Sequence, residues 1–342
     1  MNANLKPRDN GLGGLAVFRA DQVGSFLRPK VLLDARGQAA KGEITPEQLR
    51  AVEDKAIAEV VKFQEDVGLQ SITDGEFRRE YFHIDFLKQL GGVNTESPVS
   101  VIGPDGKEHL SPPTMLHFRG GRAGISSKHY PDLEQFYQDV ADAYGAELRS
   151  LAAAGCTSVQ MDDTNLAYLC DDGMREAARK RGDDPNELPH RYASFVNRVV
   201  AQKPAGMTLS MHLCRGNFKS TWAAQGGYEP VAEALLSKMD IDAYFLEYDD
   251  QRSGDFKPLR FLPKGKIVVL GLITTKLGSL EDKDAIKRRI DEAAQYAPLE
   301  QLALSPQCGF SSTVHGNDIA VEQQAQKLRL VIEIAREVWG ES

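Results

Sequence analysis

The feature that most constrains the fold is a regular alternation of short apolar runs with longer amphipathic stretches. Helical periodicity occurs in residues 45–68, 132–155, 230–239, 281–297 and 316–339. The strand candidates are residues 16–24, 69–74, 115–120, 157–162, 208–213, 242–248, 266–273 and 302–306. Strands that alternate with helices favour a parallel α/β sheet, and eight strands is the number in a (β/α)8 barrel. We therefore predict an α/β fold of the (β/α)8 TIM barrel class.

Two stretches interrupt this alternation. Residues 26–44, after the first strand, are expected to form an irregular insertion. Residues 91–128, after the second strand, are rich in Gly, Pro and Ser, and we expect an excursion or a small hairpin there. Residues 1–15 lack the apolar segment of a signal peptide and are expected to be a flexible leader. Residues 16–342 would then form a single catalytic domain.

Composition excludes some classes of function. The net charge of −8 and the pI near 5.5 argue against a nucleic-acid-binding surface. No run of 18 apolar residues is present, so no membrane-spanning helix is expected. With no secretory signal, the four cysteines are expected to be reduced and the chain cytoplasmic. Length and charge are compatible with a monomer or a homodimer.

A histidine and a cysteine two residues apart suggest a metal site. His212 and Cys214 end the fifth strand, where residues i and i+2 face the same side. Glu247 ends the sixth strand and Cys308 follows the eighth, so all four would meet at the barrel mouth. Imidazole, thiolate and carboxylate are the ligands that zinc takes. The alternative from spacing alone is that Cys308 is a buried thiol and His212 a hydrogen-bonded core residue.

A zinc ion held by two thiolates and a carboxylate would be electron-rich and suited to binding an external thiol. A bound thiol loses its proton, so the chemistry that fits is alkyl transfer to sulfur. For an amino-acid thiol, Glu76 and Asp162 are candidates to hold the ammonium group, and Ser25 the carboxylate. The alternative for the two acids is ion pairing with Arg78, Arg79 or Lys276. Cys156 and Cys170 receive no role.

The motifs together resemble one known family. They are VGSFLRP (23–29), TDGEFRREYFHIDFL (73–87), QMDD (160–163), MHLCRGN (211–217), FLEYDD (245–250) and SPQCGFSS (305–312). From about residue 17 to the C-terminus, the chain resembles the catalytic domain of cobalamin-independent methionine synthase, in its short single-domain branch. The resemblance implies an S-methyltransferase, like 5-methyltetrahydropteroyltriglutamate–homocysteine methyltransferase, that makes methionine. It implies zinc on His212, Cys214, Glu247 and Cys308, and homocysteine on Ser25, Glu76 and Asp162.

Two departures from the family leave the methyl donor open. The full-length enzyme has two barrels, whereas this chain has room for the catalytic one. The full-length enzyme also has a histidine after the seventh strand, where this chain reads GLITTKLGSLED and offers Lys276. The candidate donors are methylfolate, a methylcorrinoid, a folate carried by a partner protein, or another activated methyl compound. Asp162, Lys276 and His83 are the candidate catalytic residues, with a packing or capping role as the alternative for His83.

Two other functions fit the same residues. One is a zinc-dependent alkyltransferase that uses another thiol or electrophile, like the relative that joins an epoxide to a sulfonate thiol. The other is a barrel that only binds a thiol or a metal, as a sensor or delivery module. The acidic pair Glu76 and Asp162 favours an amino-acid thiol over a sulfonate.

Overall fold

The computed structural model describes residues 14–90, 98–102, 108–113, 128–217 and 219–340. Its centre is a parallel five-stranded sheet in the order β3-β4-β5-β6-β7. The strands are β3 (Ser158–Asp163), β4 (Thr208–Leu213), β5 (Ala243–Glu247), β6 (Ile267–Ile273) and β7 (Leu302–Pro306). All five were predicted from apolar runs, within one residue at each end. β4 to β7 are buried along their whole length. β5, β6 and β7 accordingly appear in the sequence as mainly apolar runs, whereas β4 alternates polar and apolar residues.

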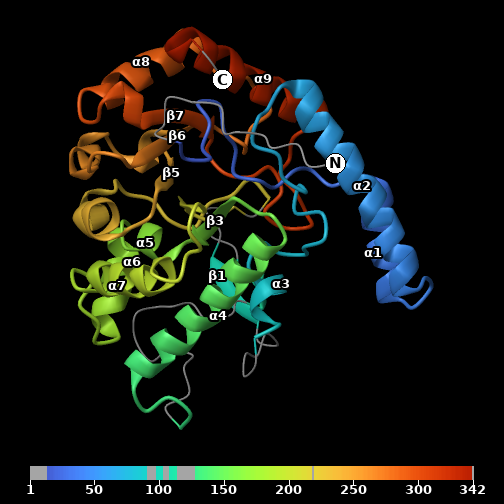
Figure 1. Ribbon diagram of the computed structural model, residues 1–342, viewed down its shortest axis with the longest axis horizontal. Coiled ribbons are helices and arrows are strands. Elements are labelled where there is room, and N and C mark those ends of the chain that lie inside the picture. The colour runs from blue at the N-terminus through green and yellow to red at the C-terminus, as the bar shows by residue number, and fades with distance from the viewer. Residues whose placement is uncertain (1–13, 91–97, 103–107, 114–127, 218, 341–342) are drawn as a thin grey trace.

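Helices cover this sheet (Figure 1), with α9 packed on β7 and α8 on β6. The α-helices are α1 (Lys30–Ala40), α2 (Pro46–Val67), α3 (Ile84–Leu87), α4 (Leu133–Ala153), α5 (Asn165–Tyr168), α6 (Asp172–Lys180), α7 (Leu188–Val200), α8 (Lys283–Ala294) and α9 (Val321–Trp339). Shorter helices are η1 (Glu229–Val231), η2 (Glu233–Lys238), η3 (Gln251–Ser253), η4 (Lys257–Phe261) and η5 (Leu299–Gln301). The helix expected at 230–239 is therefore a 3-10 turn followed by a π-helix.

Helix α2 illustrates how local sequence sets the ends of an element. The Thr45 hydroxyl accepts a hydrogen bond from the Gln48 N–H, and the Gln48 side chain accepts one from the Thr45 N–H. This capping box satisfies two N–H groups at the start of the helix. Gly68 ends the helix with φ of +102°, a conformation that glycine adopts without strain.

The first predicted strand, 16–24, is reduced to one bridge. Ala20 pairs in parallel with Leu304 of β7, through hydrogen bonds of 2.9 Å on either side. The chain at Ala20 thereby continues the sheet beyond β7. The rest of this segment is not a strand, because side chains form the hydrogen bonds that its backbone groups would make in a sheet. The Ala16 N–H, for example, donates to the Thr208 hydroxyl at 2.9 Å.

The second predicted strand, 69–74, is wrong as a strand. The amide of Gln64, on α2, binds both the N–H and the carbonyl of Thr73, at 3.0 and 2.8 Å. These are the groups that a β-ladder would need. The Thr73 hydroxyl instead donates to the Gly24 carbonyl at 2.6 Å, which still holds this segment beside the first one. The third predicted strand, 115–120, lies outside the described residues, as does most of the predicted leader.

The two insertions have different outcomes. The irregular insertion expected at 26–44 is wrong, because its centre forms α1. Pro29 precedes α1 with φ of −66°, and Leu32 and Ala35 lie one turn apart and are buried. In the second insertion, β1 (Pro98–Ile102) and β2 (Glu108–Pro113) pair as an antiparallel hairpin, as expected.

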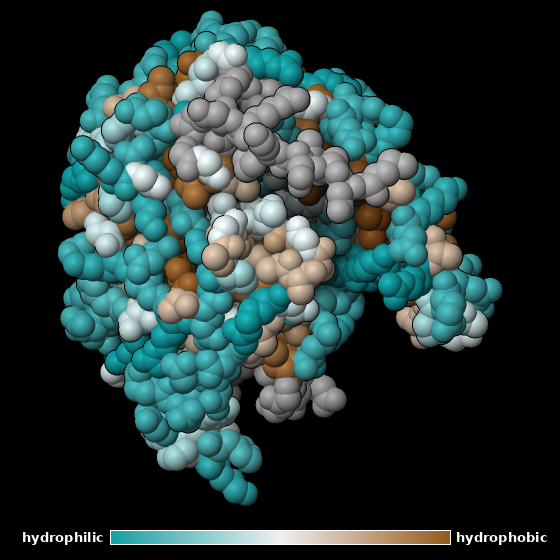
Figure 2. Space-filling model, viewed as in Figure 1, coloured by the Kyte–Doolittle hydropathy of each residue, from teal (hydrophilic) through white to brown (hydrophobic). Residues whose placement is uncertain are grey.

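Within the described residues, no helix is long and apolar enough to cross a membrane. The face in Figure 2 is mainly hydrophilic.

Candidate metal centre

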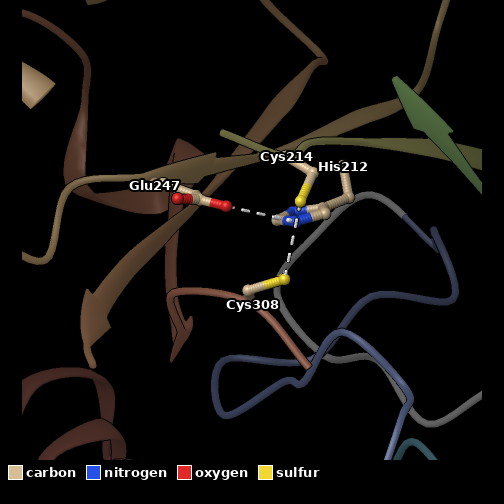
Figure 3. A group of neighbouring side chains, drawn as sticks. All are labelled: His212, Cys214, Glu247 and Cys308. Atoms are coloured by element: carbon tan, nitrogen blue, oxygen red, sulfur yellow. Dashed lines mark hydrogen bonds and ion pairs between the residues drawn. The ribbon is translucent and has the colours of Figure 1, made fainter. Parts of the chain in front are cut away.

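Four side chains from three strand ends converge on one point. His212 lies on β4, Cys214 directly follows that strand, Glu247 ends β5, and Cys308 comes two residues after β7. One ligand atom of each lies within 4.8 Å of the others. His212 Nε2 is 3.6 Å from Glu247 Oε1, and the sulfurs of Cys214 and Cys308 are 3.8 Å apart (Figure 3). The predicted convergence at the C-terminal ends of the strands is therefore present.

The chemistry of these atoms fits a metal ion. All four side chains are buried, and the exposed fraction of Glu247 is 0%. Within the described part of the chain, neither imidazole nitrogen of His212 has a hydrogen-bond partner, nor does Glu247 Oε2. Buried polar atoms without partners are rare in folded proteins. Two sulfurs, an imidazole and a carboxylate in one buried cluster match the ligand preference of zinc.

The titration behaviour of the cluster leads to the same expectation. Burial raises the pKa of Glu247 to about 7, although the charge of Lys276 opposes the rise. Burial alone would lower the pKa of His212, but the charges of Cys308, Asp162 and Glu247 outweigh it and raise the pKa to about 9. A hydrogen bond from Cys214, and next the charge of His212, lower the pKa of Cys308. The raised pKa values of Glu247 and His212 indicate that these groups retain protons in the buried cluster, and a divalent cation would take the place of those protons.

Neighbouring residues fix the orientation of Glu247. The backbone N–H of Arg215 donates to Glu247 Oε1 at 3.1 Å. The Tyr228 hydroxyl accepts from the Glu247 N–H at 2.9 Å and donates to its carbonyl at 3.2 Å. The fully buried Arg215 guanidinium lies 4.4 Å from the centroid of the Tyr228 ring. Sequence reasoning missed both residues; the available signal was an arginine directly after Cys214.

The predicted substrate-binding residues lie on segments that border this cluster. Asp162, on β3, is the direct cross-strand partner of His212. Burial raises the pKa of Asp162 to about 6. Burial also raises the pKa of Glu76 to about 7; the guanidinium of Arg79 opposes the rise, and the charge of Asp162 adds to it. The Ser25 hydroxyl accepts from the Ser311 N–H at 3.2 Å, so it contacts the loop that carries Cys308.

The ion-pair alternative applies in part. Glu76 lies 3.7 Å from Arg79, which is about half exposed, whereas Arg78 pairs with Glu53 and Asp54. Glu76 also has φ of +59°, which is uncommon for a residue other than glycine and occurs often at functional sites. Its Oε2 is buried and has no hydrogen-bond partner in the described part of the chain. One oxygen of Glu76 is therefore still available to a ligand.

The two candidate proton donors differ in their surroundings. The Lys276 ammonium is buried, acts electrostatically on Glu247 and Cys308, and has no hydrogen-bond partner among the described residues. His83 immediately precedes α3, with its ring 4.3 Å from that of Phe82. The Phe82 N–H donates to the Ser312 carbonyl at 3.1 Å, so this segment borders the loop after Cys308. The catalytic roles of both residues stay predictions.

Comparisons with known proteins give the family of this chain. The family model "Cobalamin-independent synthase, Catalytic domain" matches residues 18–117 and 115–337. Uncharacterized protein YxjH of Bacillus subtilis (strain 168) is 44% identical over an alignment of 359 positions, which covers 95% of each chain. A methionine synthase of Pyrococcus abyssi (strain GE5 / Orsay) is 24% identical over 86% of this chain and 87% of its own.

A solved structure extends the likeness to the fold. It is the crystal structure of a Listeria monocytogenes protein assigned to the vitamin-B12 independent methionine synthases. The TM-score is 0.72 at 36% sequence identity, and the match covers 96% of this chain and 99% of that chain. This likeness, together with the parallel sheet, confirms the predicted (β/α)8 barrel class.

Proposed function

This chain belongs to the family of cobalamin-independent synthase catalytic domains, and we propose that it is a zinc-dependent S-methyltransferase converting homocysteine to methionine. The observation that carries the proposal is the buried cluster of His212, Cys214, Glu247 and Cys308. When bound there, zinc would lower the pKa of the substrate thiol, so that the nucleophilic thiolate exists at neutral pH.

The remaining residues would position the two reactants. Glu76 and Asp162 hold the ammonium group of homocysteine, and Ser25 with nearby backbone N–H groups holds its carboxylate. This orientation aims the sulfur at the methyl carbon of the donor and removes much of the entropic cost of the encounter. The buried ammonium of Lys276 then delivers a proton to the leaving group. In the reaction, a carbon–sulfur bond forms as the bond between the methyl group and the donor breaks.

The pH dependence of homocysteine binding follows from the two raised pKa values. An ammonium ion binds an ionised carboxylate much more strongly than a neutral carboxyl group, and burial gives Glu76 and Asp162 pKa values of about 7 and about 6. Binding is therefore strong above pH 7 and weakens as protons occupy these groups. We expect the KM for homocysteine to rise by up to about tenfold per pH unit between pH 7 and pH 5.5. Glu76→Gln should raise KM at pH 8 and flatten the profile; a wild-type KM that does not vary with pH would argue against these roles.

Lys276 provides a test of the proton donor. The methyl group of methylfolate is attached to an amine nitrogen, which leaves poorly unless it is protonated. We expect Lys276→Gln to lower the rate with methylfolate by about 100-fold, the lower range for a general acid. The rate with methylcobalamin should fall much less, because its leaving group needs no proton. Equal losses with both donors would assign Lys276 an electrostatic or structural role instead.

One set of assays separates the three candidate functions. Zinc content is measured first, and then methyl transfer to homocysteine from methylfolate and from methylcobalamin. Zinc with methionine formation supports the proposal and identifies the donor. Zinc with alkylation of a thiol by an epoxide, but without methionine formation, would favour the alkyltransferase. Zinc or thiol binding with no transfer would indicate a binding module.

Some finer expectations belong to the same proposal. Residues 16–342 would act as one catalytic domain in the cytoplasm. A corrinoid protein or a folate-carrying protein could deliver the methyl group if the free donors are inactive. Size-exclusion chromatography coupled to light scattering would distinguish a monomer from a homodimer.

A further inference from the structure

The proposed centre contains more than one sulfur that could accept a methyl group. Cys214 and Cys308 lie 3.8 Å apart, and both would be thiolates when they bind zinc. A zinc-bound thiolate of the protein is then a nucleophile next to the substrate sulfur. Methylation of a ligand would give a neutral thioether and weaken metal binding. A selective enzyme therefore benefits from lowering the reactivity of its own sulfurs.

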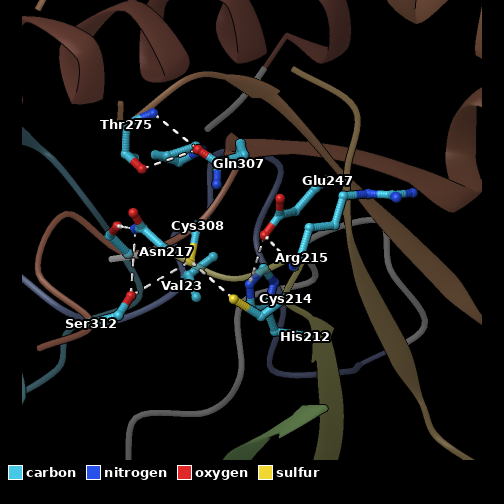
Figure 4. A network of polar contacts seen from close by, with 12 residues as sticks. Val23, His212, Cys214, Arg215, Asn217, Glu247, Thr275, Gln307, Cys308 and Ser312 are labelled. Atoms are coloured by element: carbon cyan, nitrogen blue, oxygen red, sulfur yellow. Dashed lines mark hydrogen bonds and ion pairs between the residues drawn. The ribbon is translucent and has the colours of Figure 1, made fainter. Parts of the chain in front are cut away.

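A buried hydrogen-bond chain leads to Cys308 (Figure 4). The Asn217 side-chain nitrogen donates to the Gly309 carbonyl at 2.9 Å and contacts the Ser312 hydroxyl at 3.5 Å. The Ser312 hydroxyl lies 3.7 Å from the Cys308 sulfur, within the range for a hydrogen bond to sulfur. Asn217 and Ser312 are each 8% exposed. These hydrogen bonds thus connect the loop after β4 with the loop after β7.

The direction of this chain follows from its chemistry. The Gly309 carbonyl can only accept, so it fixes the nitrogen of the Asn217 amide on its side. An amide nitrogen can only donate, so the Ser312 oxygen accepts from Asn217. The single hydroxyl proton of Ser312 is then free to point at Cys308. In this arrangement, Ser312 donates to the sulfur.

On this basis, and on the proposed zinc centre, we propose that Ser312, oriented by Asn217, is a positioning residue that suppresses methylation of Cys308. A hydrogen bond to a thiolate withdraws electron density from the sulfur lone pair that would attack the methyl carbon. The sulfur therefore becomes less nucleophilic, as thiolates of lower basicity are. Cys214 has no such serine contact among the described residues; its sulfur contacts that of Cys308. Cys308 would remain a ligand while the substrate sulfur reacts.

The test uses iodomethane as a methylating probe on the zinc-loaded protein without homocysteine. The sulfur lone pair forms the carbon–sulfur bond, the carbon–iodine bond breaks, and iodide leaves. Mass spectrometry of peptides reports methylation of Cys308 and, as an internal comparison, of Cys214. We expect Ser312→Ala to increase the rate at Cys308 by about tenfold, the effect of losing a hydrogen bond to a charged group. Ser312→Thr should restore the wild-type rate.

Two further variants and a spectroscopic measurement complete the test. Asn217→Leu should also raise the rate of Cys308 methylation, because the hydroxyl proton of Ser312 loses its orientation. If Ser312→Ala does not fold, Asn217→Leu is used in its place. Ser253→Ala, at a fully buried serine, is the matched control and should change nothing. In the cobalt-loaded protein, Ser312→Ala should move the sulfur-to-metal charge-transfer band to lower energy. An unchanged Cys308 rate in zinc-loaded Ser312→Ala and Asn217→Leu would overturn this inference alone, whereas a wild type that binds no zinc would overturn the proposed function.

Discussion

Cys308→Ser is expected to abolish zinc binding and methyl transfer while the barrel stays folded. The substitution replaces a thiolate with a neutral hydroxyl, which binds zinc poorly. It also removes one of the two sulfurs from the buried cluster. We expect activity to fall at least about 1000-fold, which corresponds to about 4 kcal/mol in the activation free energy. Zinc content by mass spectrometry and the rate of methionine formation measure the two effects.

The matched control for this prediction is Cys156→Ser. Cys156 is the partly exposed cysteine that precedes β3, outside the metal-ligand cluster. This variant should keep its zinc and its rate, which would exclude a general effect of losing a thiol. Circular dichroism should report the same helix content for both variants. If Cys308→Ser retained one zinc and full activity, the assigned ligand set would be wrong.

Gly226→Ala is expected to cause a large loss of stability, greater than that of a second glycine variant, Gly206→Ala. Gly226 has φ of +110°, and a Cβ atom there would lie 2.1 Å from the carbonyl oxygen of Cys170. The obstacle is backbone, so it cannot rotate away, and the Gly226 N–H is also bound to the Arg252 carbonyl at 2.8 Å. We expect the free energy of unfolding to fall by about 3 kcal/mol or more. Thermal or urea unfolding would measure this loss.

Gly206→Ala separates steric overlap from backbone strain. Gly206 has φ of +80°, but no atom lies within 4 Å of a Cβ atom built there. Its loss should be only about 1–2 kcal/mol, the cost of the left-handed conformation for alanine. Equal losses in the two variants would mean that the loop after β4 relaxes away from Cys170. That outcome would weaken the argument that this loop holds Arg215 and Tyr228 rigidly behind Glu247.

The sequence predicted those parts of the fold whose stability comes from burial. Residues 267–273 are buried at every position and carry no polar side chain, so hydrophobicity alone identified β6. The segment at 69–74 failed because a distant side chain, that of Gln64, binds the backbone of Thr73. The pattern of residues within 69–74 does not predict such a contact. The same limit applies to the segment that begins near Ala16, where Thr208 takes a backbone N–H.

The site likewise contains residues that the sequence predicted and residues that it did not. The convergence of His212, Cys214, Glu247 and Cys308 was predictable, because cysteine and histidine at strand ends are chemically distinctive. Asn217 and Ser312 were within the motifs but received no role, because their polar side chains are common in loops. Their importance depends on hydrogen-bond direction, which the sequence does not contain. Arg215 likewise became notable only when its complete burial against Tyr228 was known.

Zinc-edge X-ray absorption of the purified protein, before and after addition of homocysteine, tests the central claim most directly. We expect one zinc per chain with two sulfur neighbours, at about 2.3 Å, the usual zinc–sulfur distance. Addition of homocysteine should raise the number of sulfur neighbours from two to three. A protein that takes up no zinc, or a sulfur number that stays at two with saturating homocysteine, would contradict it.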